Sequence, residues 1–385
     1  MTPKNFIWNG LLTDPGTVNT VTAVHPSPTI DADGAGHFWL PASTDALLAA
    51  ALQANARASW RDLAELADTS ESTAARRVRA LVASGAVRST VIADPIRCGL
   101  GLPVTVLFRV NNKSLRPLRD HLIQREDVRL VALLTGRFSL LADFIVPSLD
   151  RLAELMTEDL TAIDATFESV THPTFREFKT TVDWAVGLVA GIPGVRTPLA
   201  DIEPAPTPIP LDKHDEALVA ALRTDGRMSF SEAGQPAGLS ESAARRRFDA
   251  LVQSGRVHPV TLVDSGLLGF HAEAFIWLNT EPGAVDQVAH ALAARPEIRY
   301  LAVVGTDSDL FCEVVLPKPS DLLKFRTDVL GALDGVTAVE VAMNVRTLKR
   351  AFLPTRVERA RDDNKDFGAR RGVIDQQEAV RVSKN

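Results

Sequence analysis

The chain contains an internal repeat with a displacement of 170 positions, and this repeat limits the folds that it can adopt. Residues 70–77, SESTAARR, recur as residues 240–247, SESAARRR. The same displacement aligns further pairs without a gap: Asp45 with Asp215, Leu52 with Leu222, Ser59 with Ser229, Gly85 with Gly255, Asp94 with Asp264, Gly99 with Gly269, Arg129 with Arg299, Leu140 with Leu310, Pro147 with Pro317, Asp164 with Asp334 and Lys179 with Lys349. This unit is longer than the units of solenoids and propellers. The 385 residues are therefore predicted to hold one two-domain module twice.

Changes in composition mark the boundaries of the two modules. Residues 192–211 are rich in proline and predict a stiff, extended linker. Residues 1–41 lack periodicity and residues 356–385 form a mixed-charge tail, so both are expected to be poorly ordered. The rest divides into two helical domains and two mixed domains, predicted at 42–93, 212–263, 100–183 and 270–352.

Charge and cysteine content narrow the class of protein. The net charge of -6 argues against a protein that coats nucleic acid or anionic membrane through bulk positive charge. Cys98 and Cys312 match no metal or redox spacing, so no metal and no cofactor is expected. The apolar runs are interrupted by charges and the N-terminus has no secretory pattern. We therefore expect a cytoplasmic protein that does not enter membranes.

The first domain of each copy is predicted to be a three-helix, winged-type helix-turn-helix. In copy one the pattern indicates helices at 42–55, 60–67 and 70–84. Ser70 suits the N-cap of the third helix and Gly85 its end. On that helix Ala74, Val78, Leu81 and Val82 are predicted to form the buried stripe.

The opposite face of the third helix carries hydroxyl groups near its start and guanidinium groups beyond them. Four arginines against one glutamate give residues 70–88 a net charge of +3. Hydroxyls and amides can contact phosphate, and arginine can donate two hydrogen bonds to guanine. The alternative is that this face is only solvated. The same face recurs after the same turn in copy two, however, and this recurrence favours binding to double-stranded DNA. The predicted DNA-binding residues are Ser70, Ser72, Thr73, Arg76, Arg77, Arg79, Ser240, Ser242, Arg245, Arg246 and Arg247.

The second copy departs from the first in ways that predict weaker binding. Thr73 becomes Ala243 and Arg79 becomes Asp249. Its second helix contains Gly234 and Pro236, and an interior proline disrupts a helix by about 3 kcal/mol or more. The first reader is therefore predicted to bind DNA more strongly than the second.

The second domain of each copy is predicted to be a ferredoxin-like βαββαβ unit, which makes the chain α+β. In copy one the strands are expected at 104–110, 128–134, 139–146 and 167–179, and the helices at 115–124 and 149–163. In copy two the strands are expected near 272–279, 297–304, 309–316 and 336–349.

A helix-turn-helix opened by residues 70–72, closed by residues 84–87 and followed by a βαββαβ domain resembles the leucine-responsive/AsnC family of transcription regulators. The turn Gly238-Leu239-Ser240 is also typical of that family. The resemblance implies a sequence-specific regulator that pairs its sheets, here into an internal pseudo-dimer, forms homo-oligomers through the βαββαβ domains and responds to an amino acid or related metabolite. It implies effector contacts at two loops, from Thr135, Gly136, Arg137 and Ser139 and from Gly305, Thr306, Asp307 and Asp309. Only the second loop offers a carboxylate for an ammonium group, so a turn without a ligand stays an alternative.

No catalytic constellation is found, and the chain is not expected to be an enzyme. Hydrolase, nucleotide-binding and metalloprotease motifs are absent. His172 and His258 are interpreted as surface or edge residues. Sirohaem decarboxylases resemble the same module, but their tetrapyrrole-binding strand is rich in histidine, tyrosine and arginine, whereas residues 127–134 and 297–304 hold no histidine and one tyrosine, Tyr300. A co-assembly partner of family members without DNA binding is a third hypothesis.

Overall fold

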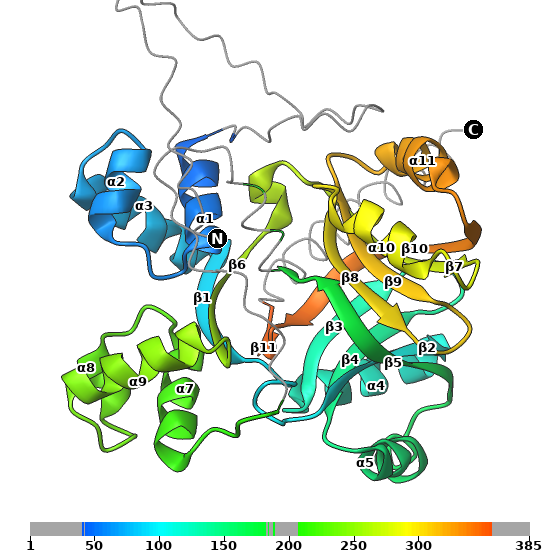
Figure 1. Ribbon diagram of the computed structural model, residues 1–385, viewed down its shortest axis with the longest axis horizontal. Helices are drawn as coiled ribbons and strands as arrows, with labels where there is room; N and C mark the ends of the chain where they lie inside the picture. The colour runs from blue at the N-terminus through cyan, green and yellow to red at the C-terminus, as the bar shows by residue number, and fades with distance from the viewer. Residues whose placement is uncertain (1–40, 42, 182–183, 185–187, 189–206, 356–385) are drawn as a thin grey trace, which may run out of the picture.

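The two copies intermingle in a helical lobe and a sheet lobe, each built from both halves of the chain (Figure 1). The computed structural model describes residues 41, 43–181, 184, 188 and 207–355. Nearly all of the predicted extension 1–41, most of the predicted linker 192–211 and the predicted tail 356–385 lie outside the described residues. Among the described residues, no helix combines the length and the apolar character needed to cross a membrane.

The α-helices and the main strands follow the same order in both copies, and copy two has the short elements η2, η4 and β11 in addition. Copy one consists of α1 (Thr44–Ala54), α2 (Trp60–Leu66), α3 (Glu71–Ser84), β1 (Val87–Ala93), β2 (Leu102–Val110), α4 (Asn112–Gln124), β3 (Val128–Leu134), β4 (Leu140–Val146), α5 (Leu149–Glu154), the π-helical turn η1 (Leu155–Asp159) and β5 (Phe167–Lys179). Copy two consists of α7 (Lys213–Thr224), α8 (Phe230–Gly234), α9 (Glu241–Gln253), β6 (Val257–Val263), η2 (Ser265–Leu268), β7 (Ala272–Thr280), α10 (Val285–Ala293), β8 (Ile298–Val304), β9 (Leu310–Leu316), α11 (Asp321–Lys324), η3 (Phe325–Val329), η4 (Leu330–Ala332), β10 (Val336–Arg350) and β11 (Leu353–Pro354).

Side-chain caps define where the helices of the two helix-turn-helix units begin. Each of the six helices follows a serine or aspartate whose side chain accepts a backbone N–H of the first turn, and such a cap contributes about 1 kcal/mol. The predicted start of α3 at Ser70 and its end at Gly85 are confirmed. As its glycine and proline predict, α8 is short and ends at Gly234, before Pro236.

An antiparallel ribbon of β1 and β6 joins the two helix-turn-helix units. Its register runs from Val87 opposite Val263 to Ala93 opposite Val257. The first helix of each unit packs on the strand of the other copy, α1 on β6 and α7 on β1. Neither strand was predicted from the sequence, because each finds its partner about half a chain away.

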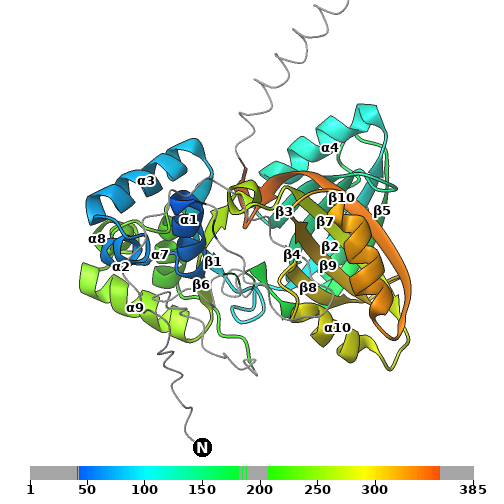
Figure 2. The same ribbon diagram turned by 90° about the horizontal axis from the view of Figure 1, so that it is seen from above.

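In the sheet lobe nine strands form one continuous sheet, which β10 closes by pairing with both β3 and β7 (Figure 2). Each copy contributes to it a four-stranded antiparallel sheet of ferredoxin-like order. Copy one has the order β3-β4-β2-β5 and copy two the order β8-β9-β7-β10. The long strands β5 and β10 continue into the sheet of the other copy, where they pair with β8 and β3. The predicted internal pseudo-dimer and the predicted α+β class are therefore both present in the fold.

Each sheet buries one face under its own helices and the other against the opposite copy. The helix-covered cores contain residues such as Phe108 and Leu118 in copy one and Ile276 and Phe325 in copy two. Between the sheets lie the rings of Phe275, Trp277, Phe311 and Tyr300, with centroids 5.4–6.5 Å apart.

Two local predictions are corrected by the structure. Val82 was placed on the buried stripe of α3, but it is 47% exposed, and the side chain that α3 buries in addition to Ala74, Val78 and Leu81 is Ala75. The predicted helix 149–163 is α-helical only to Glu154 and continues as the π-helical turn η1.

Candidate nucleic-acid interface

The two candidate reading helices, α3 and α9, begin with the same hydroxyl arrangement. Ser70 Oγ accepts the N–H of Thr73 at 3.2 Å and lies 3.0 Å from Ser72 Oγ. Ser240 Oγ accepts the N–H of Ala243 at 3.3 Å and lies 3.2 Å from Ser242 Oγ. The two capping serines therefore stabilise the helix starts, while the exposed Ser72 and Ser242 face solvent.

The turn before each reading helix uses a left-handed residue at the same position of the repeat. In copy one this residue is Asp68, with φ 45°, and in copy two it is Gly238, with φ 65°. Glycine adopts this conformation without steric cost, and aspartate tolerates it better than most residues do. The different sequences of the two turns therefore give the same geometry.

One predicted arginine on each reading helix is held by the first helix of its own unit. Arg77 pairs with Asp45 at 3.0 Å, and Arg247 pairs with Asp212 at 2.7 Å and Asp215 at 2.8 Å. The pKa of Arg247 is raised, chiefly by the hydrogen bond from its guanidinium to Asp212 and then by the one to Asp215. Arg77 and Arg247 thus orient the reading helices and are less available to DNA than the sequence alone suggests. The aligned acids Asp45 and Asp215 are the sequence signal for this role.

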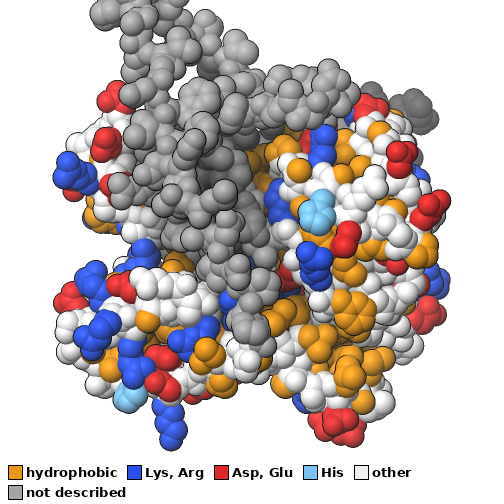
Figure 3. Space-filling view, in the orientation of Figure 1, with side chains coloured by type: hydrophobic (Ala, Val, Ile, Leu, Met, Phe, Trp, Pro, Cys, Tyr) orange, Lys and Arg blue, Asp and Glu red, His pale blue; other side chains and the backbone are white. Residues whose placement is uncertain are grey.

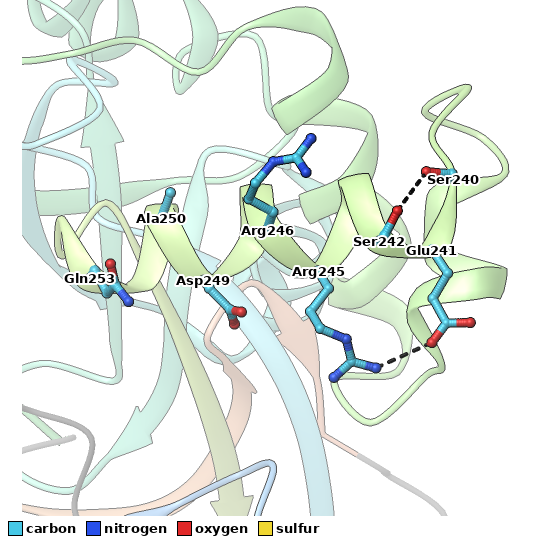
Figure 4. Close-up of a pocket in the computed structure, with 8 residues that line it drawn as sticks. All are labelled: Ser240, Glu241, Ser242, Arg245, Arg246, Asp249, Ala250 and Gln253. Carbon is cyan, nitrogen blue, oxygen red and sulfur yellow. Dashed lines mark hydrogen bonds and ion pairs between the residues drawn. The ribbon is translucent and has the colours of Figure 1, made fainter.

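The remaining arginines differ between the two helices. Arg245 donates to Glu241 at 3.2 Å and lies 4.8 Å from the centre of the Phe230 ring, on the opposite side of α9 from Arg246 (Figure 4). Within the described part of the chain, Arg76 and Arg79 on α3 and Arg246 on α9 are exposed and have no hydrogen-bond or ion-pair partner.

An open groove of about 770 Å³ runs along the outer face of α9. Its lining includes Ser242, Arg246 and Asp249 (Figure 4). Figure 3 shows basic and acidic side chains mixed over the lobe that carries α7, α8 and α9. Copy two therefore offers DNA a mixed surface, because an acid occupies the position where α3 carries Arg79.

The two predicted effector loops are both anchored on the opposite copy. Thr135 donates its N–H to Met343 O and accepts the N–H of Met343 on its hydroxyl, both at 3.0 Å. Gly305 donates its N–H to Pro173 O at 3.2 Å, and Phe175 lies so close that a Cβ on Gly305 would stand 1.9 Å from its ring. Both loops therefore lie at the crossover between sheets.

The acidic residues of the second loop have different environments. Asp309 accepts two hydrogen bonds from Thr280, from its N–H at 2.7 Å and its hydroxyl at 3.2 Å, and so braces the loop. The Asp307 side chain is 65% exposed and lies 3.8 Å from His172 Nδ1. His172, predicted as a surface or edge residue, lies on β5, the outer strand of its own copy, but is only 2% exposed. It contacts the Thr306 hydroxyl, and burial lowers its pKa.

The first loop contributes no carboxylate. Gly136 has φ 90° with open space around it, Arg137 lies 5.1 Å from the centre of the Phe138 ring, and Ser139 donates its N–H to Phe108 O at 2.8 Å. The structure also shows no group of three or more histidine, cysteine, aspartate or glutamate side chains placed to hold a metal among the residues it describes.

Comparison with known proteins agrees with this architecture. The AsnC-type helix-turn-helix domain matches residues 43–82 and 211–252, and the Lrp/AsnC ligand binding domain matches residues 273–353. An uncharacterised HTH-type transcriptional regulator of Pyrococcus horikoshii is 32% identical over 136 residues, which cover 35% of this chain and 86% of that protein. The regulator LrpA of the same organism is 27% identical over 140 residues, covering 36% of this chain and 99% of that protein. These relatives therefore correspond to one copy of the repeat.

A solved structure matches both copies together. The siroheme decarboxylase NirDL has a TM-score of 0.54 at 15% identity, with 84% of this chain and 99% of that chain covered. This likeness concerns the fold alone. The chain belongs to the Lrp/AsnC family of helix-turn-helix transcriptional regulators, with the family's module present twice in one polypeptide.

Proposed function

We propose that this regulator binds specific sequences of double-stranded DNA with α3 as its stronger reader and α9 as its weaker one. The observation that carries the proposal is the distribution of unpartnered arginines within the described residues, Arg76 and Arg79 on α3 against Arg246 on α9. A guanidinium can donate two hydrogen bonds to guanine, whereas the carboxylate of Asp249 is repelled by phosphate.

Replacing Arg76 with alanine is expected to weaken specific DNA binding more than replacing Arg246 with alanine. Loss of one bidentate contact costs about 1–3 kcal/mol, or roughly fivefold to 150-fold in affinity. The experiment first selects a preferred duplex from random sequences and then compares the two variants by gel shift over a range of salt concentrations. The affinity should also fall steeply with salt, because phosphate contacts release counterions.

Equal losses for the two variants would contradict the asymmetry, and wild-type binding without sequence preference would contradict the regulator proposal. Asp249→Arg is the matched gain-of-function variant, because it gives α9 the residue that α3 has at the same position of the repeat. It is expected to strengthen binding to a duplex with two identical half-sites.

The proposal includes an amino-acid effector at the loop of residues 305–309. The Asp307 carboxylate there accepts one hydrogen bond, from the Thr306 hydroxyl to Oδ1 at 3.2 Å, and is 65% exposed, so it can also accept from an ammonium group. The corresponding position of copy one is Arg137. Asp309, which the family resemblance favours, is already occupied by Thr280. Assembly of several chains through the sheet lobe stays a prediction.

Asp307→Asn is expected to weaken binding of the preferred proteinogenic amino acid by about tenfold, equivalent to about 1.4 kcal/mol. Isothermal titration calorimetry against a panel of amino acids measures this, with Arg137→Ala as the control at the matched position of copy one. Unchanged affinity in Asp307→Asn would place the effector elsewhere.

A non-enzymatic role is part of the same proposal. Tyr300, the one tyrosine of the strands compared with tetrapyrrole-binding strands, donates its hydroxyl to Glu177 at 2.8 Å and packs among aromatic rings between the sheets. The hydroxyl and the ring of Tyr300, which could otherwise contact a ligand, are therefore already in contact with other residues of the chain. A purified chain that shows Soret absorption after incubation with a tetrapyrrole would overturn this part of the proposal.

A further inference from the structure

Two arginines at equivalent positions of the repeat contact the opposite helix-turn-helix unit reciprocally. Arg57 lies between α1 and α2, and Arg227 lies 170 positions later between α7 and α8. Arg57 donates from Nη1 to Gly226 O at 2.5 Å and from Nη2 to Met228 O at 3.0 Å. Arg227 donates from Nη1 to Ala56 O and from Nη2 to Ala58 O, both at 2.8 Å.

Each of these guanidinium groups also stacks on an aromatic ring of the opposite unit. The Arg57 Cζ lies 4.4 Å from the centre of the Phe230 ring and 5.4 Å from that of Phe248, which belongs to the reading helix α9. The Arg227 Cζ lies 4.5 Å from the centre of the Trp60 ring, at the start of α2. Cation–π contacts contribute about 0.5–2 kcal/mol, more when water is excluded.

This pair of arginines, called the arginine clasp below, is held by carbonyls and rings. Within the described residues neither Arg57 nor Arg227 pairs with a carboxylate. Burial lowers the pKa of both groups, and the nearby charge of Arg57 lowers that of Arg227 further. Two like charges are kept partly buried and close together, which is costly unless their donors are satisfied in a fixed geometry.

The ribbon of β1 and β6 would not by itself fix the two reading helices. An isolated two-stranded antiparallel unit is at best marginally stable in water, so further contacts are needed to hold the two helix-turn-helix units. The arginine clasp adds four hydrogen bonds on the helix side of the ribbon, at the loops that precede α2 and α8. The chain is closely packed at Gly226, because a Cβ added to this glycine would lie 2.6 Å from the backbone nitrogen of Thr90.

We propose that Arg57 and Arg227 are positioning residues that fix the distance and orientation between α3 and α9, so that one chain reads two DNA half-sites at a single spacing. This inference rests on the proposed function for its DNA consequence. Its structural part, the fixed distance between the helices, is independent of DNA.

The structural part is tested by measuring the distance between spin labels on the two reading helices. Ala80 and Ala250 occupy equivalent, exposed positions on α3 and α9 and can each be replaced by cysteine for labelling. The native Cys98 and Cys312 are buried, and the unsubstituted chain serves as the labelling background. Pulsed electron paramagnetic resonance should give one narrow distance distribution with both arginines present.

The double variant Arg57→Ala/Arg227→Ala is expected to broaden this distribution at least twofold. Each single variant should broaden it less, and Arg57→Lys/Arg227→Lys should give an intermediate width, because one ammonium cannot reach both carbonyls as a planar guanidinium does. Arg61→Ala, which removes a charge from the exposed face of α2, should leave it narrow. The wild-type width should also be unchanged between about 0.1 and 1 M salt, because partly buried contacts are screened much less than exposed ones.

A narrow distribution in the double variant and in both single variants would overturn the inference. If the double variant does not fold, as judged by circular dichroism, the single variants decide. Gly226→Ala gives a further test, because its Cβ must displace the β1 backbone and should shift the mean distance.

The DNA consequence is tested with duplexes that carry two half-sites separated by increasing spacers. Wild-type affinity should fall about tenfold when about 5 base pairs, half a helical turn, are inserted. The double arginine variant should lose this dependence on spacing while keeping the wild-type affinity for a single half-site. If no duplex is preferred, the proposed function fails while the distance measurement still decides the arginine clasp. If the wild-type affinity does not depend on the spacing, the inference about Arg57 and Arg227 fails, whereas the proposal that the chain binds a single half-site is unaffected.

Discussion

Arg299→Met is expected to destabilise the sheet lobe by about 3–5 kcal/mol, because it leaves buried carboxylates without their main partner. Arg299 is 4% exposed and donates to both oxygens of Glu313, at 2.9 and 2.5 Å, and to Glu273 at 3.0 Å. Arg350 also donates to Glu313, at 2.7 and 3.1 Å. After the substitution the buried Glu313 and the partly buried Glu273 share one arginine, Arg350.

The same variant should reverse the pH dependence of stability. In the wild-type chain burial alone would raise the pKa of Glu313, but the charges of Arg299 and Arg350 outweigh burial and hold that pKa well below its ordinary value. Its contribution to stability is therefore present above the pKa of the unfolded chain and is lost as the pH falls through the folded value.

Without Arg299 the effect of burial dominates, and the folded-state pKa of Glu273 or Glu313 rises above the unfolded value. The folded variant then binds more protons than the unfolded chain, so its stability should fall as the pH rises from the unfolded pKa through the raised one. Urea denaturation followed by circular dichroism at a series of pH values measures both effects.

Two control variants distinguish the effect of leaving a buried charge without its partner from the effect of removing a side chain. Arg109→Met removes an arginine from an exposed pair with Glu168, where the expected change is below about 1 kcal/mol. Arg299→Met/Glu313→Leu leaves Arg350 with Glu273 and should recover most of the lost stability, since replacing a whole buried pair is often neutral. A single Arg299→Met variant as stable as the wild type would contradict the prediction.

Trp184→Ala is expected to cost about 3–5 kcal/mol, because a fully buried ring is removed from a junction between modules. Trp184 is 2% exposed, donates its indole N–H to Pro296 O at 2.8 Å and packs edge-on against Phe270 at 5.8 Å. The same apolar cluster includes Leu48 of α1 and Val315 of β9. The ring therefore connects the first helix-turn-helix unit to the sheet of copy two.

The loss of stability in the Trp184→Ala variant should be confined to the first of the two helix-turn-helix units. The position that corresponds to Trp184 in copy two is Pro354, so α7 has no tryptophan at this position of the repeat. Hydrogen exchange should accelerate in α1 and not in α7, and Trp184→Phe, which keeps an aromatic ring but loses the N–H donor, should show a smaller change. Equal acceleration in both helices would contradict the asymmetric anchoring.

Local features of both copies were predictable because they depend on neighbouring residues. Caps such as Ser70, the stop at Gly85 and the interruption before Pro236 each act within one or two turns of helix. The βαββαβ order followed from alternating hydrophobic patterns, and the internal pseudo-dimer from the duplication together with the family resemblance.

The predictions that were wrong concern residues whose burial or role depends on partners distant in the sequence. Val82 has the right helical phase for burial, yet it is 47% exposed, because the described residues around it cover only part of the side chain. His172 was expected at the surface or at an edge; it is on the outer strand of its own copy but is buried, because Thr306 and Asp307 of the other copy lie against it. Arg57 and Arg227 carried a signal, since both are arginine at the same displacement, but only their contacts across the copies give it a meaning.

The duplicated module, the starts of α3 and α9 and the residue types on their exposed faces could be predicted from the sequence, because helix caps and hydrophobic periodicity act over short distances. The contacts of the folded chain were needed to show which arginines have no partner among the described residues, which acids already accept hydrogen bonds and how α3 and α9 are held relative to each other. Some of these groups, such as Asp45 and Arg77, are 32 positions apart. Others, such as Arg57 and Gly226, are 169 positions apart and meet only when the two copies pack together and β1 pairs with β6. Hydrogen bonds and ion pairs act over a few ångströms, so the fold must bring such groups together before their roles can be assigned.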